Sequence, residues 1–494
     1  MLTAPMPIEL HWNFDNSYTR LPAVLFDPSE AARFPAPTLV IANEALAREL
    51  GLDLSRASVG ELAAIFSGQT VPAGATPIAQ AYAGHQYGHF TMLGDGRAIV
   101  LGEQITPRGA RVDIQFKGSG ETRYSRRGDG RAALGPMLRE YVVSEAMHAL
   151  GIPTTRSLAV AATGEVVLRA APLPGAVLVR VAASHVRVGT FQFAAAVGDP
   201  LLPAALLEHA IARHDPHLAA AAAGERAVAF LDAVVARQAD LVARWMLVGF
   251  VHGVMNTDNM AVSGETIDYG PCAFLDTYDP ATVFSSIDRD GRYAYSNQPA
   301  IAHWNLARLA ESLLPLVPGD EAAAVDMLRG PLATFPERFA RSHLAQARAK
   351  LGLADAEAGD ADLFAGLLER MHRGRADFTA TFAALARLAE APDLAPEAGD
   401  ATLGDWLPAW RARLARQPGS SADAVALMRR SNPVVIPRNQ RVEEALAAAE
   451  AGDLAVLHRL LAAVRSPFVE TPENAPYRAA PPPGCGPYRT FCGT

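Results

Sequence analysis

The chain has 494 residues, of which 50% are hydrophobic and 19% charged, and its formal net charge is −8. This length and composition predict a globular protein with an ample core, organised as roughly two to four domains or as one large two-lobed enzyme. The acidic balance lacks the positive field that attracts nucleic acid, so we expect no nucleic-acid partner.

The chain carries no sign of export or of a membrane anchor. The stretch MLTAPMPIELHWNF has no basic segment followed by an apolar core, as a secretory signal would. Apolar runs such as WMLVGFV are too short to span a bilayer. The cysteines are Cys272, Cys485 and Cys492, too few for a disulfide framework. We therefore expect a soluble, cytoplasmic protein with no membrane partner.

The N-terminal half is predicted to be rich in strands. Short apolar and β-branched runs predict strands, and helical spacing with Pro at the start or Gly at the end predicts helices. Residues 1–80 are loops punctuated by Pro, with one helix. In chain order we expect a helix over 43–52, strands over 96–105 and 111–118, a helix over 136–151, and strands over 157–182 with a hairpin-like turn ATGE at 162–165.

The C-terminal half is predicted to be helical. From about residue 200 the sequence is rich in Ala, Leu and Arg, and a loop region over 252–300 interrupts it. The Pro-rich stretch 466–494 is expected to be extended or partly disordered. Strands before helices predict an α+β enzyme of two lobes with a cleft between them. We place the boundaries at 1–80 (N-terminal extension), 81–195 (β-rich lobe), 196–465 (helical lobe) and 466–494 (tail).

Lysine is rare in this chain. There are 2 lysines against 42 arginines, so a retained lysine suggests a site that needs a compact ammonium group. Lys117 ends a predicted strand, and kinases pair such a lysine with a helix glutamate to hold nucleotide phosphates. Glu140 and Glu145 lie on the next helix, and we favour Glu140 because it is nearer the N-terminus. Lys350, in an Ala-rich helix, is interpreted as having no such role.

Glycine turns and buried arginines suggest a polyphosphate ligand. In MLGDGRAIVLGE, Gly94 and Gly96 would let backbone N–H groups approach phosphates, although an ordinary hairpin turn explains them too. The segment YSRRGDGRAALG repeats GDGRA and adds cations suited to phosphate or to a charged surface turn. Arg180 and Arg187 lie among apolar residues, where an unpaired arginine is costly, so a phosphate or a structural carboxylate should face them.

The stretch HGVMNTDNM, residues 252–260, is similar to a kinase catalytic loop. Asn259 follows His252 by seven residues, and Asp268 lies nine residues further on in DYG. In kinases the equivalent Asn and Asp hold Mg²⁺. The kinase base position, however, is Val254, which cannot accept a proton. Asp258 offers a carboxylate next to Asn259.

Several motifs together closely resemble the selenoprotein O family: YAGHQYG, GDGRA, DIQFKGSG, SHVRVGTFQ, GFVHGVMNTDNM, TIDYGPCAF and NPVVIPRNQRVEEAL. The similarity runs over about 80–300, with further matches near 431–446 and at the C-terminus. It implies a protein-kinase-like fold with a β-rich N-lobe and a mostly helical C-lobe. It also implies a protein adenylyltransferase, which moves AMP from ATP to Ser, Thr or Tyr hydroxyls of proteins and releases pyrophosphate. The nucleotide would lie flipped relative to kinases.

The resemblance also assigns roles to residues. Asp258 would be the proton acceptor, Glu140 would pair with Lys117, and Asn259 and Asp268 would hold Mg²⁺ or Mn²⁺. Whether the protein also transfers AMP to itself stays open. The residues implied to bind ATP are Gly94, Gly96, Arg97, Lys117, Asp129, Gly130, Arg180, Arg187 and Asp268.

Two other functions stay open: a kinase-like phosphotransferase and a catalytically silent ATP-binding scaffold. Val254 in the kinase base position argues against the first. The retained Lys117, Asn259 and Asp268 argue against the second, because a scaffold need not keep metal ligands. Cys492 stands where some family members carry selenocysteine, so it has either a redox role or that of a free tail thiol.

Overall fold

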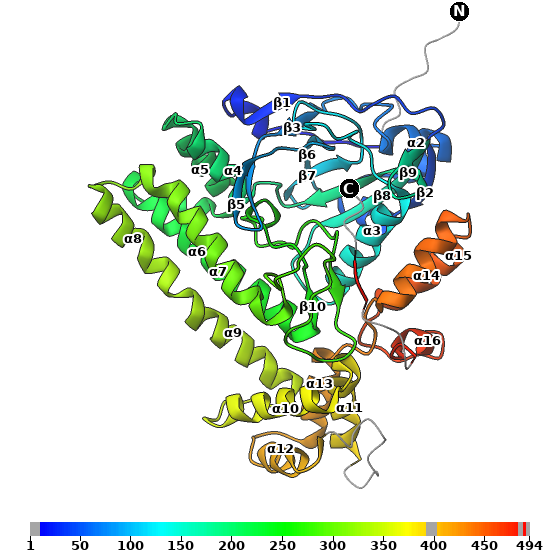
Figure 1. The fold of residues 1–494 in the computed structure, drawn as a ribbon, viewed down its shortest axis with the longest axis vertical. Coiled ribbons are helices and arrows are strands. Elements are labelled where there is room, and N and C mark those ends of the chain that lie inside the picture. The colour runs from blue at the N-terminus through cyan, green and yellow to red at the C-terminus, as the bar shows by residue number, and fades with distance from the viewer. Residues whose placement is uncertain (1–9, 392–402, 483–487, 491–494) are drawn as a thin grey trace, which may run out of the picture.

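The computed structural model describes residues 10–391, 403–482 and 488–490. An antiparallel seven-stranded sheet forms the N-terminal part, and the C-terminal part is largely helical (Figure 1), which confirms the predicted α+β class. Across the sheet the strands are β1 (Phe26–Pro28), β3 (Ile78–Gln80), β6 (Ala98–Ile105), β7 (Arg111–Lys117), β9 (Pro172–Ala182), β8 (Arg156–Leu168) and β2 (Thr38–Ala42).

Both faces of the sheet are covered, which explains the apolar character of its central strands. Along β9, Leu178 packs on the side of helix α3 (Leu134–Ala149), whereas Val177 and Val179 pack on the side of α2 (Val59–Phe66). Successive side chains of a strand point to opposite faces, so a strand buried on both sides is apolar throughout. A short helix, α1 (Glu44–Glu49), precedes α2.

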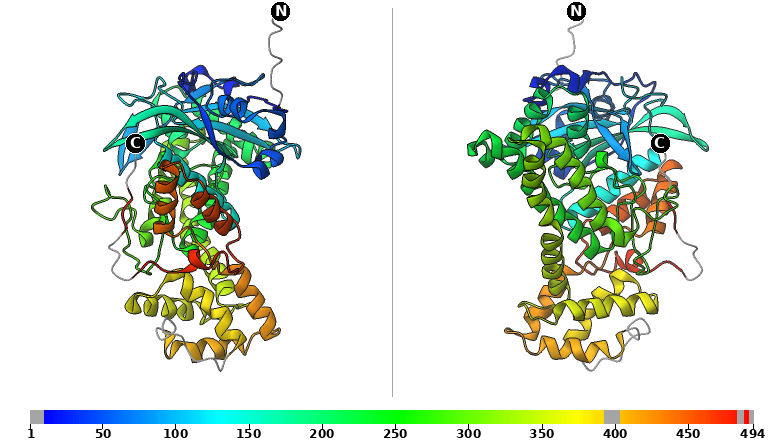
Figure 2. Two further views of the ribbon diagram at one scale, coloured as in Figure 1. Left: turned by 90° about the vertical axis from the view of Figure 1, so that its right-hand side faces the viewer. Right: turned by 60° about the vertical axis from the view of Figure 1, so that its left-hand side comes forward.

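Helix α3 confirms the helix predicted over 136–151 and begins two residues earlier, at Leu134. Pro136 therefore lies inside its first turn, where backbone N–H groups have no intrahelical partner and proline is tolerated. Gly151 follows the helix with φ +74°. Helices α14 (Asn439–Glu450) and α15 (Ala455–Val464), orange in Figure 2, pack against α3, so the C-terminal part of the chain returns to the sheet domain.

The predicted turn at ATGE, residues 162–165, is wrong. Strand β8 continues to Leu168, and the turn to β9 lies at residues 169–171. The pairing of β8 with β9 shifts register between Ala162 and Val166, and Gly164 there has φ +77°. A glycine in the left-handed region can form a bulge that bends a strand, as well as a turn that reverses it.

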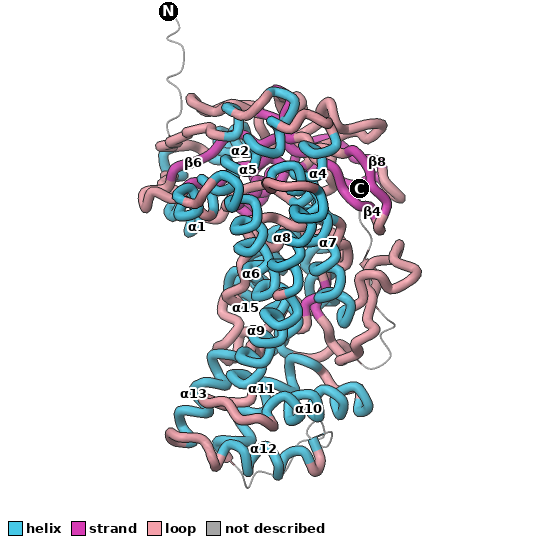
Figure 3. The backbone as a smooth tube through the Cα atoms, turned by 90° about the vertical axis from the view of Figure 1, so that its left-hand side faces the viewer, coloured by secondary structure: helices cyan, strands magenta, loops and turns pink. Residues whose placement is uncertain are grey.

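The helical part begins beside the sheet and extends away from it (Figure 3). Within the described residues, no helix is long and apolar enough to cross a membrane. The helices are α4 (Val188–Ala196), α5 (Leu201–His214), α6 (Ala223–Val248), α7 (Gln298–Leu313), α8 (Glu321–Ala333), α9 (Phe335–Lys350), α10 (Asp360–Gly374), α11 (Phe378–Glu390), α12 (Trp406–Leu414), α13 (Ser421–Ser431) and the single turn α16 (Ala475–Arg478).

Two small antiparallel ladders hold the loop that follows α6. Strand β10 (Phe250–Val251) pairs with β11 (Ala273–Phe274) and closes the loop at its base. The hairpin β4 (Ala83–Gln86) and β5 (His89–Met92) contacts the short 3₁₀ turn Thr257–Asn259 in the middle of the loop. The loop is thereby fixed from two sides.

Lys350 lies at the C-terminus of α9 and is only 4% exposed. Its Nζ lies 4.3 Å from the centroid of the Phe382 ring. Burial lowers the pKa of Lys350 to about 7. Among the residues that the structure describes, no carboxylate pairs with Lys350, and a buried ammonium without such a partner costs free energy, so this lysine is expected to weaken the fold.

We predict that Lys350→Met raises the melting temperature at pH 7, with a gain of about 1 kcal/mol or more. The unfolded chain restores the usual lysine pKa, so between the two pKa values it binds a proton that the folded protein does not. Wild-type stability therefore rises with pH across this window, and the advantage of the variant should shrink towards pH 10. Thermal unfolding at pH 7 and pH 10 measures the difference in stability between wild type and variant. The control is Arg341→Met, because Arg341 is an exposed residue on the same helix. Equal or lower stability of Lys350→Met at pH 7 would contradict it.

Candidate active site

Lys117 and Glu140 form an ion pair between the sheet and α3. The Lys117 Nζ is 2.7 Å from Glu140 Oε2 and 2.7 Å from Asp268 Oδ1. The lysine ends β7, and α3 lies across the neighbouring strands, so its first turns face the strand end. The preference for Glu140 over Glu145 agrees with this geometry, because Glu145 pairs instead with Arg156 at 2.7 Å.

Arg180 extends this ion pair into a network. In the register of β7 and β9 it lies opposite Gln115, and its side chain is 2% exposed. It donates to Glu140 Oε1 at 2.7 Å and to Asp268 Oδ1 at 2.5 Å. A buried guanidinium needs such partners, because an unpaired one would pay the full cost of desolvation.

Arg187 approaches the same carboxylate from another element. It is the N-cap of α4, and its NH1 donates to the backbone carbonyl of Asp258 at 2.9 Å and to Asp268 Oδ2 at 3.3 Å. Its guanidinium also lies 4.5 Å from the centroid of the Tyr82 ring, a distance at which cation–π attraction operates. Both arginines thus have carboxylate partners, one of the two alternatives that their sequence context left open.

The Asp268 carboxylate forms ion pairs with all three cations described above. Burial alone would raise its pKa, but Arg180, Lys117 and Arg187 together hold the pKa well below its usual range. Its backbone has φ +63°, a conformation uncommon outside glycine. The chain therefore turns sharply at DYG and directs this carboxylate at the three cations.

Asp258 lies on the turn Thr257–Asn259 and lines the same cavity as the three cations and Asp268. Gln86 Nε2 donates to its Oδ1 at 2.8 Å. Burial raises the pKa of Asp258 to about 6, against the lowering effect of Arg187. A carboxylate that lines a cavity is a candidate general base.

Asn259 and Asp268 are suited to a cation that arrives with a phosphate ligand. Asn259 Nδ2 donates to the carbonyl of Val254 at 3.0 Å, which fixes the amide and leaves Oδ1 to act as a ligand. Among the described residues, no group of three or more His, Cys, Asp or Glu side chains could hold a metal ion. Two oxygen ligands from the protein, completed by phosphate oxygens and water, are typical of Mg²⁺ sites.

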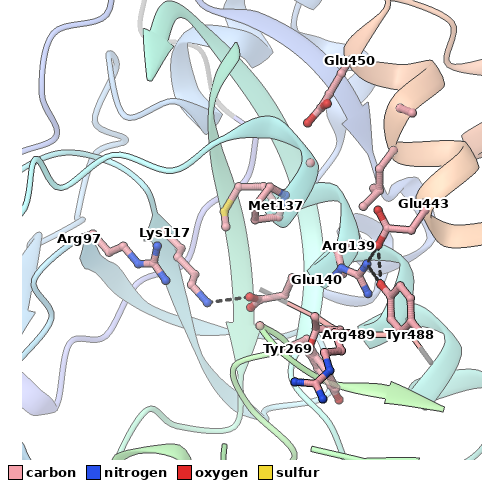
Figure 4. Close-up of a pocket in the computed structure, with 16 residues that line it drawn as sticks. Arg97, Lys117, Met137, Arg139, Glu140, Tyr269, Glu443, Glu450, Tyr488 and Arg489 are labelled. Atoms are coloured by element: carbon pink, nitrogen blue, oxygen red, sulfur yellow. Dashed lines mark hydrogen bonds and ion pairs between the residues drawn. The ribbon is translucent and has the colours of Figure 1, made fainter. Parts of the chain in front are cut away.

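Two neighbouring cavities share part of their lining in this region. The first, with a volume of about 340 Å³, contains Asp258. The second, of about 460 Å³, shares Arg97, Lys117 and Gly270 with it. Its far side is formed by α14 and by residues 488–490, where Arg139, Glu443 and Tyr488 contact one another (Figure 4). Of the residues expected to form the site, the first cavity is lined by Gly96, Arg97, Lys117, Arg180, Arg187, Asp258, Asn259 and Asp268.

Other expected residues lie outside this lining. Asp129 pairs with Arg169 at 2.8 Å. Gly130 has φ +66°, and a Cβ on it would come within 2.1 Å of the Gly120 backbone. Gly94 has φ +139° and lies against the ring of Tyr124. Cys492 falls outside the described residues.

The sequence analysis did not single out Asp95, Gln86 or Asn256, all of which line the first cavity. Asp95 is 1% exposed and lies 3.7 Å from Arg187, and burial raises its pKa to about 6. Its position inside GDGR, next to residues that were identified, was the available signal. The two amides also lie inside quoted motifs, YAGHQYG and HGVMNTDNM, but their roles depend on partners about 170 residues away in the chain.

Comparison with known proteins assigns the chain to a family. Residues 9–465 match the family described as Protein adenylyltransferase SelO. The chain is 56% identical to the "Protein nucleotidyltransferase YdiU" of Halalkalibacterium halodurans over 490 residues, 98% of each chain. It is 56% identical to the protein of the same name from Geobacillus kaustophilus, covering 98% of this chain and 99% of the relative, and 54% identical to that of Syntrophotalea carbinolica, covering 98% of each. The chain therefore belongs to the SelO family of protein adenylyltransferases.

Proposed function

We propose that this chain transfers AMP from ATP to Ser, Thr or Tyr hydroxyls of proteins and releases pyrophosphate. Family membership supports nucleotidyl transfer to protein. The observation that carries the residue-level proposal is Asp258, a carboxylate that lies in the cleft beside the buried cations while Val254 occupies the kinase base position. The acceptor hydroxyl would have its base at Asp258.

We also propose that the fold is that of a two-lobed protein kinase, with the N-lobe over 81–195 and the C-lobe over 196–465. Strands β1, β2 and β3 of the N-terminal extension add the outer strands to the N-lobe sheet. The ion pair between a strand lysine and a helix glutamate supports this proposal, since kinases place their phosphate-binding lysine in the same way. The closed loop that carries Asn259 and Asp268 supports it as well.

The three cations would bind the triphosphate. Lys117, Arg180 and Arg187 converge on Asp268, which acts as their counter-ion here. Phosphate oxygens that enter the cleft would take over part of this pairing, and the guanidinium groups can each donate two parallel hydrogen bonds to them. Cations already fixed in place stabilise the charge that develops on the leaving pyrophosphate without reorganising during the reaction.

Asp258 would accept the proton of the acceptor hydroxyl. The hydroxyl oxygen would bond to the α-phosphorus while its O–H bond breaks towards Asp258 and the bond from the α-phosphorus to the bridging oxygen breaks. Mg²⁺ or Mn²⁺ held by Asn259 and Asp268 would supply charge neutralisation at the phosphates. Arg187 fixes the backbone of the base through the Asp258 carbonyl.

Label transfer separates the candidate reactions. With ATP and a divalent cation, we predict that label at the α-phosphate marks protein, on this chain itself or on an added acceptor, and that γ-label does not. Autoradiography of denatured, gel-separated samples measures it. Transfer of γ-label alone would identify a kinase, and ATP binding without transfer of either label would identify a silent scaffold.

We predict that Asp258→Asn lowers the rate of AMP transfer by about 10²–10⁴-fold, the usual cost of removing a general base. The affinity for ATP should change little, because the cations that bind phosphate remain. Initial rates with α-labelled ATP and calorimetric titration with ATP measure the two quantities. Asp326→Asn, an exposed aspartate on α8, is the matched control. A rate within tenfold of wild type would rule out Asp258 as the base.

Lys117→Arg should be nearly as damaging as Lys117→Met, although this chain uses arginine for almost every other cation. The ammonium is 7% exposed and contacts two carboxylates at 2.7 Å, which leaves no room for a planar guanidinium. We expect at least about 10²-fold loss of kcat/KM for ATP in both variants, because a 1 Å displacement alone can cost that much. An arginine variant within fivefold of wild type would show that charge alone suffices.

A further inference from the structure

We infer that Gln86, on the β4–β5 hairpin, is a positioning residue that holds the Asp258 carboxylate in place for the acceptor hydroxyl. The inference rests on the proposed function, because it assigns a partner to the proposed base. Gln86 lies in the segment YAGHQYG, which the resemblance includes without giving it a role. Its side chain reaches the cleft although 172 residues separate it from Asp258.

Three consecutive residues of the hairpin contact three consecutive residues of the catalytic loop. The flanking contacts come from the hairpin backbone, so they can hold the two segments together whatever the side chain of Gln86 is. The central contact comes from its side chain and ends on the carboxylate. The bonds are His85 N to Thr257 Oγ1 at 2.8 Å, Gln86 Nε2 to Asp258 Oδ1 at 2.8 Å, and Tyr87 N to Asn256 Oδ1 at 3.0 Å.

The orientation of the Gln86 amide is determined by its neighbours. Asn256 Oδ1 accepts from the Tyr87 backbone N–H and from the Tyr293 hydroxyl at 2.5 Å. Asn256 must therefore present its Nδ2, which donates to Gln86 Oε1 at 3.0 Å. Gln86 in turn must present its Nε2 to Asp258. The donors all point in one direction, and such chains strengthen each member by polarisation.

The hairpin also limits where the carboxylate can lie. A Cβ on Gly84 would come within 2.3 Å of Asp258 Oδ1 and 2.6 Å of Gln86 Nε2. Oδ1 is thus enclosed by the hairpin backbone on one side and bound by the amide on the other. We assign the second oxygen to the acceptor hydroxyl. Catalytic groups need this kind of support, because small displacements of a reacting group are expensive.

The test compares Gln86→Ala with Gln86→Glu. We expect Gln86→Ala to lower kcat for AMP transfer by about 10–100-fold, while ATP affinity stays within about threefold, because the phosphate-binding residues are untouched. At pH 8, Gln86→Glu keeps the length of the side chain and can still accept from Asn256. Two carboxyl groups at this distance either repel each other or share one proton, and both states disturb Asp258 as the base, so the kcat of Gln86→Glu should be no higher than that of Gln86→Ala.

A purely structural role for Gln86 predicts the opposite order, since glutamate fills the same space as glutamine. His89→Ala is the matched control, because His89 lies opposite Gln86 in the hairpin and is exposed. It should keep wild-type kcat. A Gln86→Glu enzyme more active than Gln86→Ala would overturn the inference.

Crystal structures of wild type, Gln86→Ala and Gly84→Ala supply a readout that does not depend on activity. We expect the Asp258 carboxylate to change rotamer or lose its fixed position in both variants while residues 83–92 keep their fold. An unmoved carboxylate in Gln86→Ala would overturn the inference. If wild type transfers no AMP, the proposed function fails, and the position of Asp258 in these structures still decides the role of Gln86.

Discussion

The site depends on one network of charges, formed by the buried Lys117, Glu140 and Arg180 and the partly exposed Asp268. The four groups come from two strands, one helix and one loop, so their pairing fixes the relative positions of these elements. Removing one partner from such a network costs about 3–5 kcal/mol, because it leaves an uncompensated buried charge. The network therefore serves both as a tertiary constraint and as an arrangement of cations ready for a polyanion.

Val254 stands where a kinase has its catalytic base, but here it serves the structure of the loop. Its side chain packs against the core, and its backbone carbonyl accepts the hydrogen bond that orients Asn259. The backbone supplies this acceptor whatever the side chain is. An apolar residue there is compatible with an ordered loop, and the carboxylate lies four residues further on at Asp258, which the hairpin supports.

The sequence predicts those parts of the structure that depend on local pattern or on known spacing. The strands β6 and β7, the helix α3 and the residues Lys117, Glu140, Asn259 and Asp268 are of this kind. The continuation of β8 through ATGE is not, because a Gly-containing segment can form a turn or a bulge, and pairing with β2 and β9 decides between them. Gln86 and Asn256 could not be identified either, since an amide acquires a role only from neighbours that the fold brings to it.

The second cavity shows how far apart in the chain the walls of a single cavity can lie. Arg97 and Lys117 lie on one side of it, and Tyr488 and Thr490, nearly four hundred residues later, lie on the other. Thr490 also bonds to the carbonyl of Pro271 at 2.8 Å and pairs with Ser285. During synthesis on the ribosome, the early strands emerge long before this wall exists. The cavity thus cannot be closed on this side before residues 488–490 have been made and have docked beside Pro271 and Ser285.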